Sequence, residues 1–357
     1  MPVHAVLDNY YLALTLLVTV VYQLSGFAIA WTLQFDKITD LTGGSNFFIL
    51  GKFSLLTLLV GGTFQTRNVV ASALVMVWAV RIAGFLFFRV LKTGHDGRFD
   101  EIRSSFFKFL AFWIGQILWV WLVSLPVTIL NSPAVSDPAH GGSSPRFGTS
   151  RDIAGLVLWG IGFLMEAHNS RRAEGSSPLV FQSMALTGLK YRYKSSKTIS
   201  KDLPIASGVW AWSRHPQYFG EMMCWWGMWI LCLSPTTDGS VSGNARSAQY
   251  GAIVSPIFTV IVLMFGSGMP TSVKPQAKRF YLKSYGPGAK PEQAIIWSQY
   301  KEYVRRTSIL IPLPPVVYAP LPEFIKNTIL FNWPVIFQFS EEKDGRAAVE
   351  EAESNLI

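Results

Sequence analysis

Residues 109–136 read FLAFWIGQILWVWLVSLPVTILNSPAVS and contain no charged side chain. A second stretch, residues 247–273, is equally free of charge. A helix needs about 20 mostly apolar residues to cross about 30 Å of hydrocarbon, and each stretch exceeds that length. Because two such stretches occur in one chain, we expect an all-α protein that crosses a membrane more than once.

The composition of the whole chain supports this prediction. Half of the 357 residues are hydrophobic and only 15% are charged, whereas a soluble domain carries about 25% charged residues. These values exclude a disordered protein and an ordinary cytosolic enzyme. The two cysteines, Cys224 and Cys232, are too few for a disulfide framework or a zinc site, so we expect no metal centre.

Apolar runs of suitable length predict about seven membrane spans. Ionisable residues inside these runs, among them Lys52, Arg81 and Glu166, are costly inside a bilayer. Each is either functional or near a membrane interface, and the two cations can extend toward the membrane surface. We expect Gly155, Gly160 and Gly162 to be helix-packing residues. The predicted spans are residues 10–33, 46–66, 68–90, 107–130, 151–169, 217–236 and 247–268.

The distribution of Lys and Arg predicts the orientation. Most of these residues follow the first, third, fifth and seventh spans, and few follow the others. Because cytosolic loops of membrane proteins are enriched in Lys and Arg, the N-terminus should lie outside or in a lumen, and the C-terminus in the cytosol. We expect one transmembrane domain over residues 1–340. The acidic segment 341–357 lacks aromatic residues and is expected to be disordered.

The strongest local motif lies where the basic fifth loop meets the sixth span. It reads GVWAWSRHPQYFGE over residues 208–221. Pro216 suits the first turn of a helix, and the free amides of that helix start, together with Arg214 and His215, suit an anion. Glu221 would be costly one turn inside a span unless it binds a ligand or a cation. The alternative is a membrane-interface belt, which explains the aromatic residues but not Glu221.

This motif resembles that of the steroid 5-alpha-reductase-like membrane reductases, closest to a microbial branch of that family. Further matches follow in order over residues 30–320, and the part similar to the reductase C-terminal region covers about 150–320. The matching segments are Asp36–Asp40 with Asn46-Phe47, Trp78 and Arg81, Gly94–Asp100, Gln116 and Trp119, Leu125-Pro126, Gly266–Pro270, and Tyr300–Pro312.

The resemblance implies an NADPH-dependent oxidoreductase acting on CH–CH groups. Hydride would reduce a carbon–carbon double bond of a lipid, such as a steroid, sterol or other enone, and the enzyme would reside in the endoplasmic reticulum or another endomembrane. Glu221 and Tyr218 would be catalytic. The cofactor-binding positions would be Arg214, His215, Gln217, Tyr218, Glu221, Tyr300, Arg305 and Arg306.

Two further interpretations remain open from the sequence. A membrane methyltransferase of the isoprenylcysteine or phospholipid type, which uses S-adenosylmethionine, shares the Arg-His-Pro motif, although residues 239–291 lack the paired glutamates of that class. A non-catalytic lipid-binding membrane protein is the other.

Residues 168–190 depart from the family pattern and would replace a cofactor segment, either as an insertion or as a retained intron. Arg305 and Arg306 could equally be plain cytosolic charges.

Overall fold

The computed structural model describes residues 7–34, 38–61, 65–93, 102, 104–167 and 208–355. Contacts divide the chain into two compact units. Among the described residues, the first unit takes those up to Phe163 together with Met222–Thr259. The second unit takes residues 164–167, 208–221 and those from Val260 onward. We describe the two units separately.

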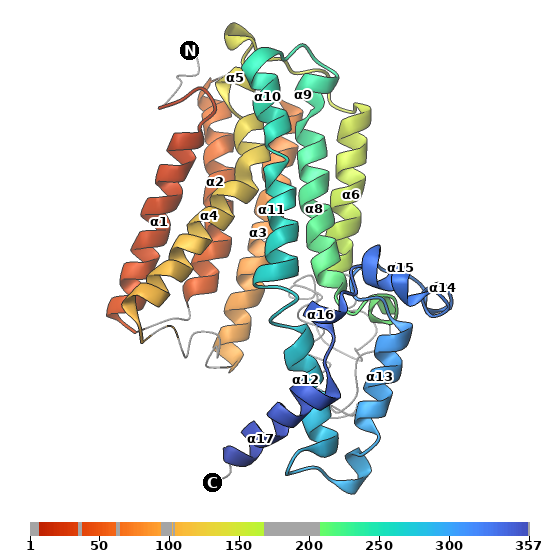
Figure 1. Cartoon of the computed structure of the whole chain (residues 1–357). Helices are drawn as coiled ribbons and strands as arrows, with labels where there is room; N and C mark the ends of the chain where they lie inside the picture. The colour runs from red at the N-terminus through yellow and green to blue at the C-terminus, as the bar shows by residue number, and fades with distance from the viewer. Residues whose placement is uncertain are drawn as a thin grey trace, which may run out of the picture. The chain divides into compact units, whose positions relative to one another are not determined.

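Each of the seven predicted spans coincides with a helical segment (Figure 1). In the first unit, α1 packs against α2 and α4, and α2 packs against α3 and α4. The segments are α1 (Leu12–Thr32), α2 (Thr39–Gly61), α3 (Thr66–Thr93), α4 (Phe106–Leu130), α6 (Ser150–Ala167), α8 (Pro216–Cys232), and finally α10 (Gly243–Gly251) with α11 (Val254–Ile261) and the π-helical turn Val262–Gly266.

Within the described residues, four helical segments are long and apolar enough to cross a membrane. The protein is therefore a multi-pass membrane protein, while the count of seven and the orientation stay predictions. Two of the remaining helices fall short for simple reasons. Helix α8 has only 17 residues, and α6 carries Arg151, Asp152 and Glu166 among its 18. The four segments are Leu12–Thr32, Thr66–Phe87, Phe106–Ser136 and Gly243–Gly266.

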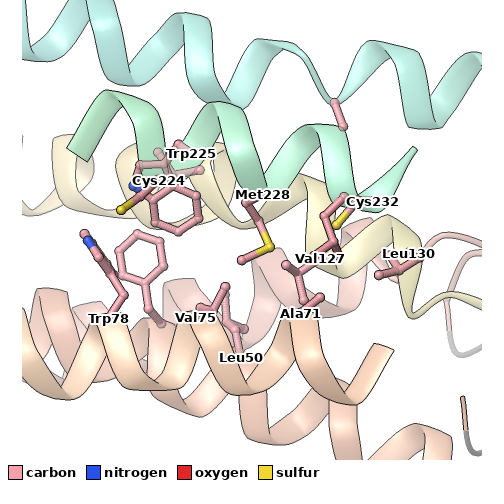
Figure 2. Close-up of a cluster of buried hydrophobic side chains, with 14 of the residues drawn as sticks. Leu50, Ala71, Val75, Trp78, Val127, Leu130, Cys224, Trp225, Met228 and Cys232 are labelled. Atoms are coloured by element: carbon pink, nitrogen blue, oxygen red, sulfur yellow. The ribbon is translucent and has the colours of Figure 1, made fainter. Parts of the chain in front are cut away.

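An aromatic cluster forms the core of the first unit. Phe47 of α2 and Trp78 of α3 meet edge to face with ring centroids 5.1 Å apart, and Trp78 meets Trp225 of α8 at 5.0 Å. Such pairs contribute about 0.5–1.5 kcal/mol beyond their burial. Figure 2 shows this face of α8, from which the free cysteines Cys224 and Cys232 also point into the core. The two cysteines therefore serve as small apolar core residues.

Helices α6 and α8 approach each other closely through two glycines. A Cβ atom added to Gly155 would lie 2.6 Å from the Gly227 carbonyl oxygen, closer than real side chains come. The prediction of a packing role is therefore confirmed for Gly155. It is not confirmed for Gly160, where a Cβ would meet no atom of the described residues within 4 Å.

A buried ion pair connects the start of α3 to the start of α6. Arg67 Nε donates to Asp152 Oδ1 at 2.7 Å, and both side chains are almost fully buried. The same carboxylate accepts from the Ser234 hydroxyl at 2.9 Å and from the backbone N–H of Gly148 at 2.9 Å. Further bonds run from Arg67 to the carbonyls of Pro145 and Arg146. A buried charge pair needs such additional hydrogen bonds to offset its desolvation.

The second unit is built on two helices that follow the last candidate span. Helix α12 (Val273–Tyr285) packs against α13 (Ile296–Arg306) through Phe280, Trp297 and Tyr300. Three short helices follow, α14 (Pro315–Tyr318), α15 (Glu323–Thr328) and α16 (Pro334–Phe337).

The C-terminal segment differs from the expected disorder. Residues Glu341–Gly345 form a π-helical turn, and α17 (Arg346–Ser354) packs against α12. The acidic residues of this segment suggested a solvated tail. In the structure they form ion pairs with basic residues, for example Glu351 with Lys278 at 2.6 Å. Ala348 is buried beneath them. Charge complementarity with α12 and α13, which composition alone does not reveal, thus accounts for the helix.

Candidate functional site

Backbone hydrogen bonds tie the predicted motif to the segment that follows α13. Arg214 N donates to the Ser308 carbonyl at 2.8 Å, and Leu313 N donates to the Trp212 carbonyl at 3.1 Å. The Tyr303 hydroxyl donates to the Trp210 carbonyl at 3.0 Å. Two segments about 90 residues apart are therefore held side by side, and Arg214 faces the C-terminal part of the chain.

Helix α8 begins at Pro216, which confirms the predicted helix start. His215, immediately before it, is buried and stacks on the Tyr218 ring with centroids 5.5 Å apart. The Tyr218 hydroxyl lies 3.1 Å from the Gly268 carbonyl oxygen and 2.6 Å from the Ser272 hydroxyl. Tyr218 therefore connects the first turn of α8 to the segment that leads into α12.

A cavity of about 270 Å³ lies in the second unit beside Arg214. Its wall combines basic side chains with aromatic rings, and most of it comes from α13 and the segment after it. The lining side chains are Arg214, Val273, Ala277, Trp297, Tyr300, Lys301, Val304, Arg305, Tyr318, Glu323, Lys326, Asn332, Phe337, Gln338, Phe339 and Glu341.

Arg214 is the central cation of this cavity. Its side chain is only 8% exposed, and one of its terminal nitrogens donates to Asn332 Oδ1 at 2.6 Å. Its Nε is buried and finds no hydrogen-bond partner among the described residues. An unpaired buried donor on a charged group is costly, so a site of this kind favours an anionic ligand.

Tyr300 and two further basic residues of α13 line the same cavity. Burial raises the pKa of the Tyr300 hydroxyl, against the opposing effect of Arg214, so the hydroxyl stays neutral at physiological pH. Lys301 pairs with Glu341 at 2.8 Å, and Arg305 pairs with Glu302 at 2.8 Å. Both cations lie at the exposed rim, where ion pairs are weak and exchange readily with a ligand.

The structure brings together some of the predicted site residues and not others. Arg214, Tyr300 and Arg305 share the cavity. His215, Gln217, Tyr218 and Glu221 lie around the first turns of α8 and are not among the residues lining it. Arg306 is exposed, with Nε 3.5 Å from Glu302, and is also not among them.

The side chain of Gln217, at the start of α8, has a feature that suits a ligand. Its Oε1 is buried, and no described residue donates a hydrogen bond to it. The half-buried Glu221 lies about one turn further along the helix. The start of α8 thus combines a carboxylate with a side-chain carbonyl oxygen that accepts no hydrogen bond from the described residues. Both groups accept hydrogen bonds rather than bind anions, so they complement the cationic cavity.

Sequence reasoning missed Asn332 and Lys326. Both lie beyond the motifs quoted above, in a stretch that reads as an apolar tail. Lys326 offered one signal, because it and Glu323 are the only charged residues between 313 and 337. Asn332 offered none, since its role depends on a contact across 118 residues. The matching residues Asp36 and Gly94–Asp100, and the departing residues 168–190, lie outside the described residues.

The fold and the cavity define a multi-pass helical membrane protein with a cationic, aromatic-lined cavity next to one of its helix starts. The protein belongs to a steroid 5-alpha-reductase-like family described as "Protein of unknown function (DUF1295)", which matches residues 26–286. Comparison with curated proteins and with solved structures gave no match.

Proposed function

We propose that this protein is an integral-membrane reductase that uses NADPH to reduce a carbon–carbon double bond of a lipid. The observation that carries the proposal is Arg214, a nearly buried guanidinium whose Nε has no protein partner among the described residues. Arg suits phosphate because its planar fork pairs with two oxygens at once. The family likeness to steroid 5-alpha-reductases supplies the reaction type.

The residues of the cavity fit the phosphate-bearing end of such a cofactor. Arg214 would bind a phosphate from the buried side, with Lys301 and Arg305 at the rim. The rings of Trp297 and Tyr300, which lie 5.5 Å apart, offer apolar surface for a base. The cavity of about 270 Å³ lies just below the usual range of ligand pockets, about 300–1,000 Å³, so it suits part of a dinucleotide.

The start of α8 would hold the reactive end of the cofactor. NADPH supplies the hydride when bound. Gln217 Oε1 and the Glu221 carboxylate would accept hydrogen bonds from the nicotinamide amide, and Tyr218 would hold the segment before α12 in place through Ser272. We further propose that all seven helices cross an endomembrane, with the C-terminus in the cytosol where NADPH is available.

Cofactor binding to the purified full-length protein tests the proposal. Calorimetric titration with NADPH, and separately with S-adenosylmethionine, should give binding for NADPH alone. Arg214→Lys keeps the charge but loses the fork, and should weaken NADPH binding about 10-fold or more. The matched control is Arg279→Lys, since Arg279 is an exposed arginine of α12 that does not line the cavity.

Two outcomes would overturn the proposal. Binding of S-adenosylmethionine without NADPH would identify a methyltransferase. Binding of neither compound, by a protein whose helix content matches that expected from the structure, would favour a non-catalytic lipid-binding protein. If NADPH binds, its oxidation in the presence of extracted lipids, followed at 340 nm, would connect binding to turnover.

A further inference from the structure

The segment between residues 313 and 337 has an unusual surface. Large apolar side chains cover its outside, including Val316, Phe324 and Val335, which are 82%, 74% and 92% exposed. Val317, Ile329 and Ile336 are exposed as well. Apolar surface gathered on one short stretch marks a contact with a membrane or another macromolecule.

The charges of this segment are neutralised within it. Glu323 and Lys326 are its only charged residues, and they pair with each other at 2.9 Å. The Lys326 side chain is nearly buried, and its ammonium also donates to the Ala319 carbonyl at 3.3 Å. The segment therefore presents no free cation to its surroundings. An acidic protein partner would therefore find no free cation here to pair with.

The segment is attached to the end of a membrane span. Trp333 stacks on Phe265, with ring centroids 5.5 Å apart and planes inclined by 13°. Phe265 is the second-last residue of the candidate span Gly243–Gly266. Trp333 also stacks on Phe337 at 6.0 Å. Tryptophan at the end of a span is typical of the membrane–water interface, so the exposed apolar residues start at headgroup depth.

The backbone of the segment suits a shallow position in the bilayer. Helices α14, α15 and α16 are short and joined by irregular backbone, which the hydrocarbon interior does not tolerate when it faces lipid. The prolines at positions 314, 315, 320, 322 and 334 lack an N–H group that would need a partner. Headgroup-level insertion satisfies the remaining polar groups with water while it buries the apolar side chains.

We propose that residues 313–337 form an interfacial membrane anchor, which inserts Val316, Phe324 and Val335 into the lipid surface at the end of the Gly243–Gly266 span. The occupant of this apolar surface is thus the bilayer itself. Since Asn332 of the same segment binds Arg214, the lipid surface also steadies one wall of the cavity. The anchor does not depend on which cofactor the cavity binds.

Spin labels on single introduced cysteines test this proposal. The two native cysteines are buried, so a label reacts first with the introduced thiol, and the unmodified protein provides the blank. Val316→Cys, Phe324→Cys and Val335→Cys would each be made in the full chain and reconstituted in phosphatidylcholine vesicles. The control is Gln299→Cys, on the exposed face of α13. Oxygen, which concentrates in lipid, and a water-soluble nickel chelate would serve as relaxing agents.

In vesicles, oxygen should relax the three anchor labels more strongly than nickel does, and the Gln299→Cys label should show the reverse. Stronger relaxation by nickel at all three positions would place the segment in water and overturn the proposal. Exclusion of both reagents would show that protein covers the surface, and would overturn it equally. Light scattering of the solubilised protein would then tell whether that protein is a second copy.

Discussion

Arg214 donates to Asn332 Oδ1 at 2.6 Å, although 118 residues separate the two side chains. The family match ends at residue 286, so Arg214 lies inside it and Asn332 lies outside it. The cationic cavity is thus assembled from a part of the chain that the family shares and a part that follows. Substitutions at Arg214 and at Asn332 therefore measure separately what each part contributes to ligand binding in the cavity.

Asn332→Ala should weaken NADPH binding about 10- to 100-fold. The substitution removes a charge-assisted hydrogen bond, which contributes about 1.5–3 kcal/mol, and leaves the Arg214 guanidinium less firmly oriented. Calorimetric titration of the purified variant measures the change. Asn355→Ala, at an exposed position near the C-terminus, is the matched control. An unchanged dissociation constant for Asn332→Ala would show that Arg214 is oriented by other contacts.

Glu341→Gln should strengthen binding of the anionic ligand by up to about 5-fold. Glu341 lines the cavity and pairs with Lys301 at 2.8 Å, so it competes with a phosphate for that ammonium. An exposed pair of this kind is worth about 0.2–1 kcal/mol, which bounds the gain. The neighbouring Glu342→Gln, which does not line the cavity, should leave the affinity unchanged.

The same competition gives a pH dependence. The hydrogen bond from Lys301 lowers the pKa of Glu341 from its ordinary 4.5, so the carboxylate stays ionised at neutral pH. The hydrogen bond between Glu341 and Lys301 therefore persists as the pH falls, and is lost only when the pH drops below the ordinary carboxyl pKa of 4.5. Between pH 6 and 8 the benefit of Glu341→Gln should therefore be constant. A benefit that vanished within this window would contradict the assignment.

Glu221→Gln should lower reductase turnover far more than it lowers the yield of membrane-inserted protein. The variant keeps the size of the side chain but loses the charge that strengthens a hydrogen bond to an amide N–H, worth about 1.5–3 kcal/mol. Glu353→Gln, on the exposed face of α17, is the control. Full NADPH-dependent activity of Glu221→Gln would leave Glu221 as an interfacial residue without a role at the nicotinamide.

Gly155→Ala should destabilise the protein by about 1–3 kcal/mol, the usual cost of overpacking. The new methyl group would lie 2.6 Å from the Gly227 carbonyl oxygen, and backbone cannot move aside as a side chain can. Gly160→Ala, on the same helix, adds a Cβ that meets no described atom within 4 Å, and should instead be neutral or slightly stabilising. Thermal unfolding in detergent compares the two. Equal melting temperatures of the two variants would mean that α6 and α8 lie further apart at Gly155 than the 2.6 Å approach indicates.

The helices could be predicted from the sequence because their signals are local. The charge-free residues 109–136 cover all but the first three residues of α4, and Pro216 begins α8 as expected. The cavity could be predicted only in part. Arg214 and Tyr300 lie in recognisable motifs, whereas the Asn332 contact depends on the path of a proline-rich segment that no local pattern determines. The helical Glu341–Ser354 segment was missed for the same reason, since its acidic residues pair with distant lysines.

The ion pair between Arg67 and Asp152 constrains how the chain is assembled as well as how it is held together. Asp152 is synthesised 85 residues after Arg67. Helices α3 and α4 therefore leave the ribosome before Arg67 can pair with the Asp152 carboxylate. Until α6 arrives, Arg67 must remain hydrated at the membrane surface, because burying it alone would cost several kcal/mol. The first four helices therefore cannot close completely on their own. Docking of α6 is the step that locks them, and truncation before residue 152 should leave an open, protease-sensitive intermediate.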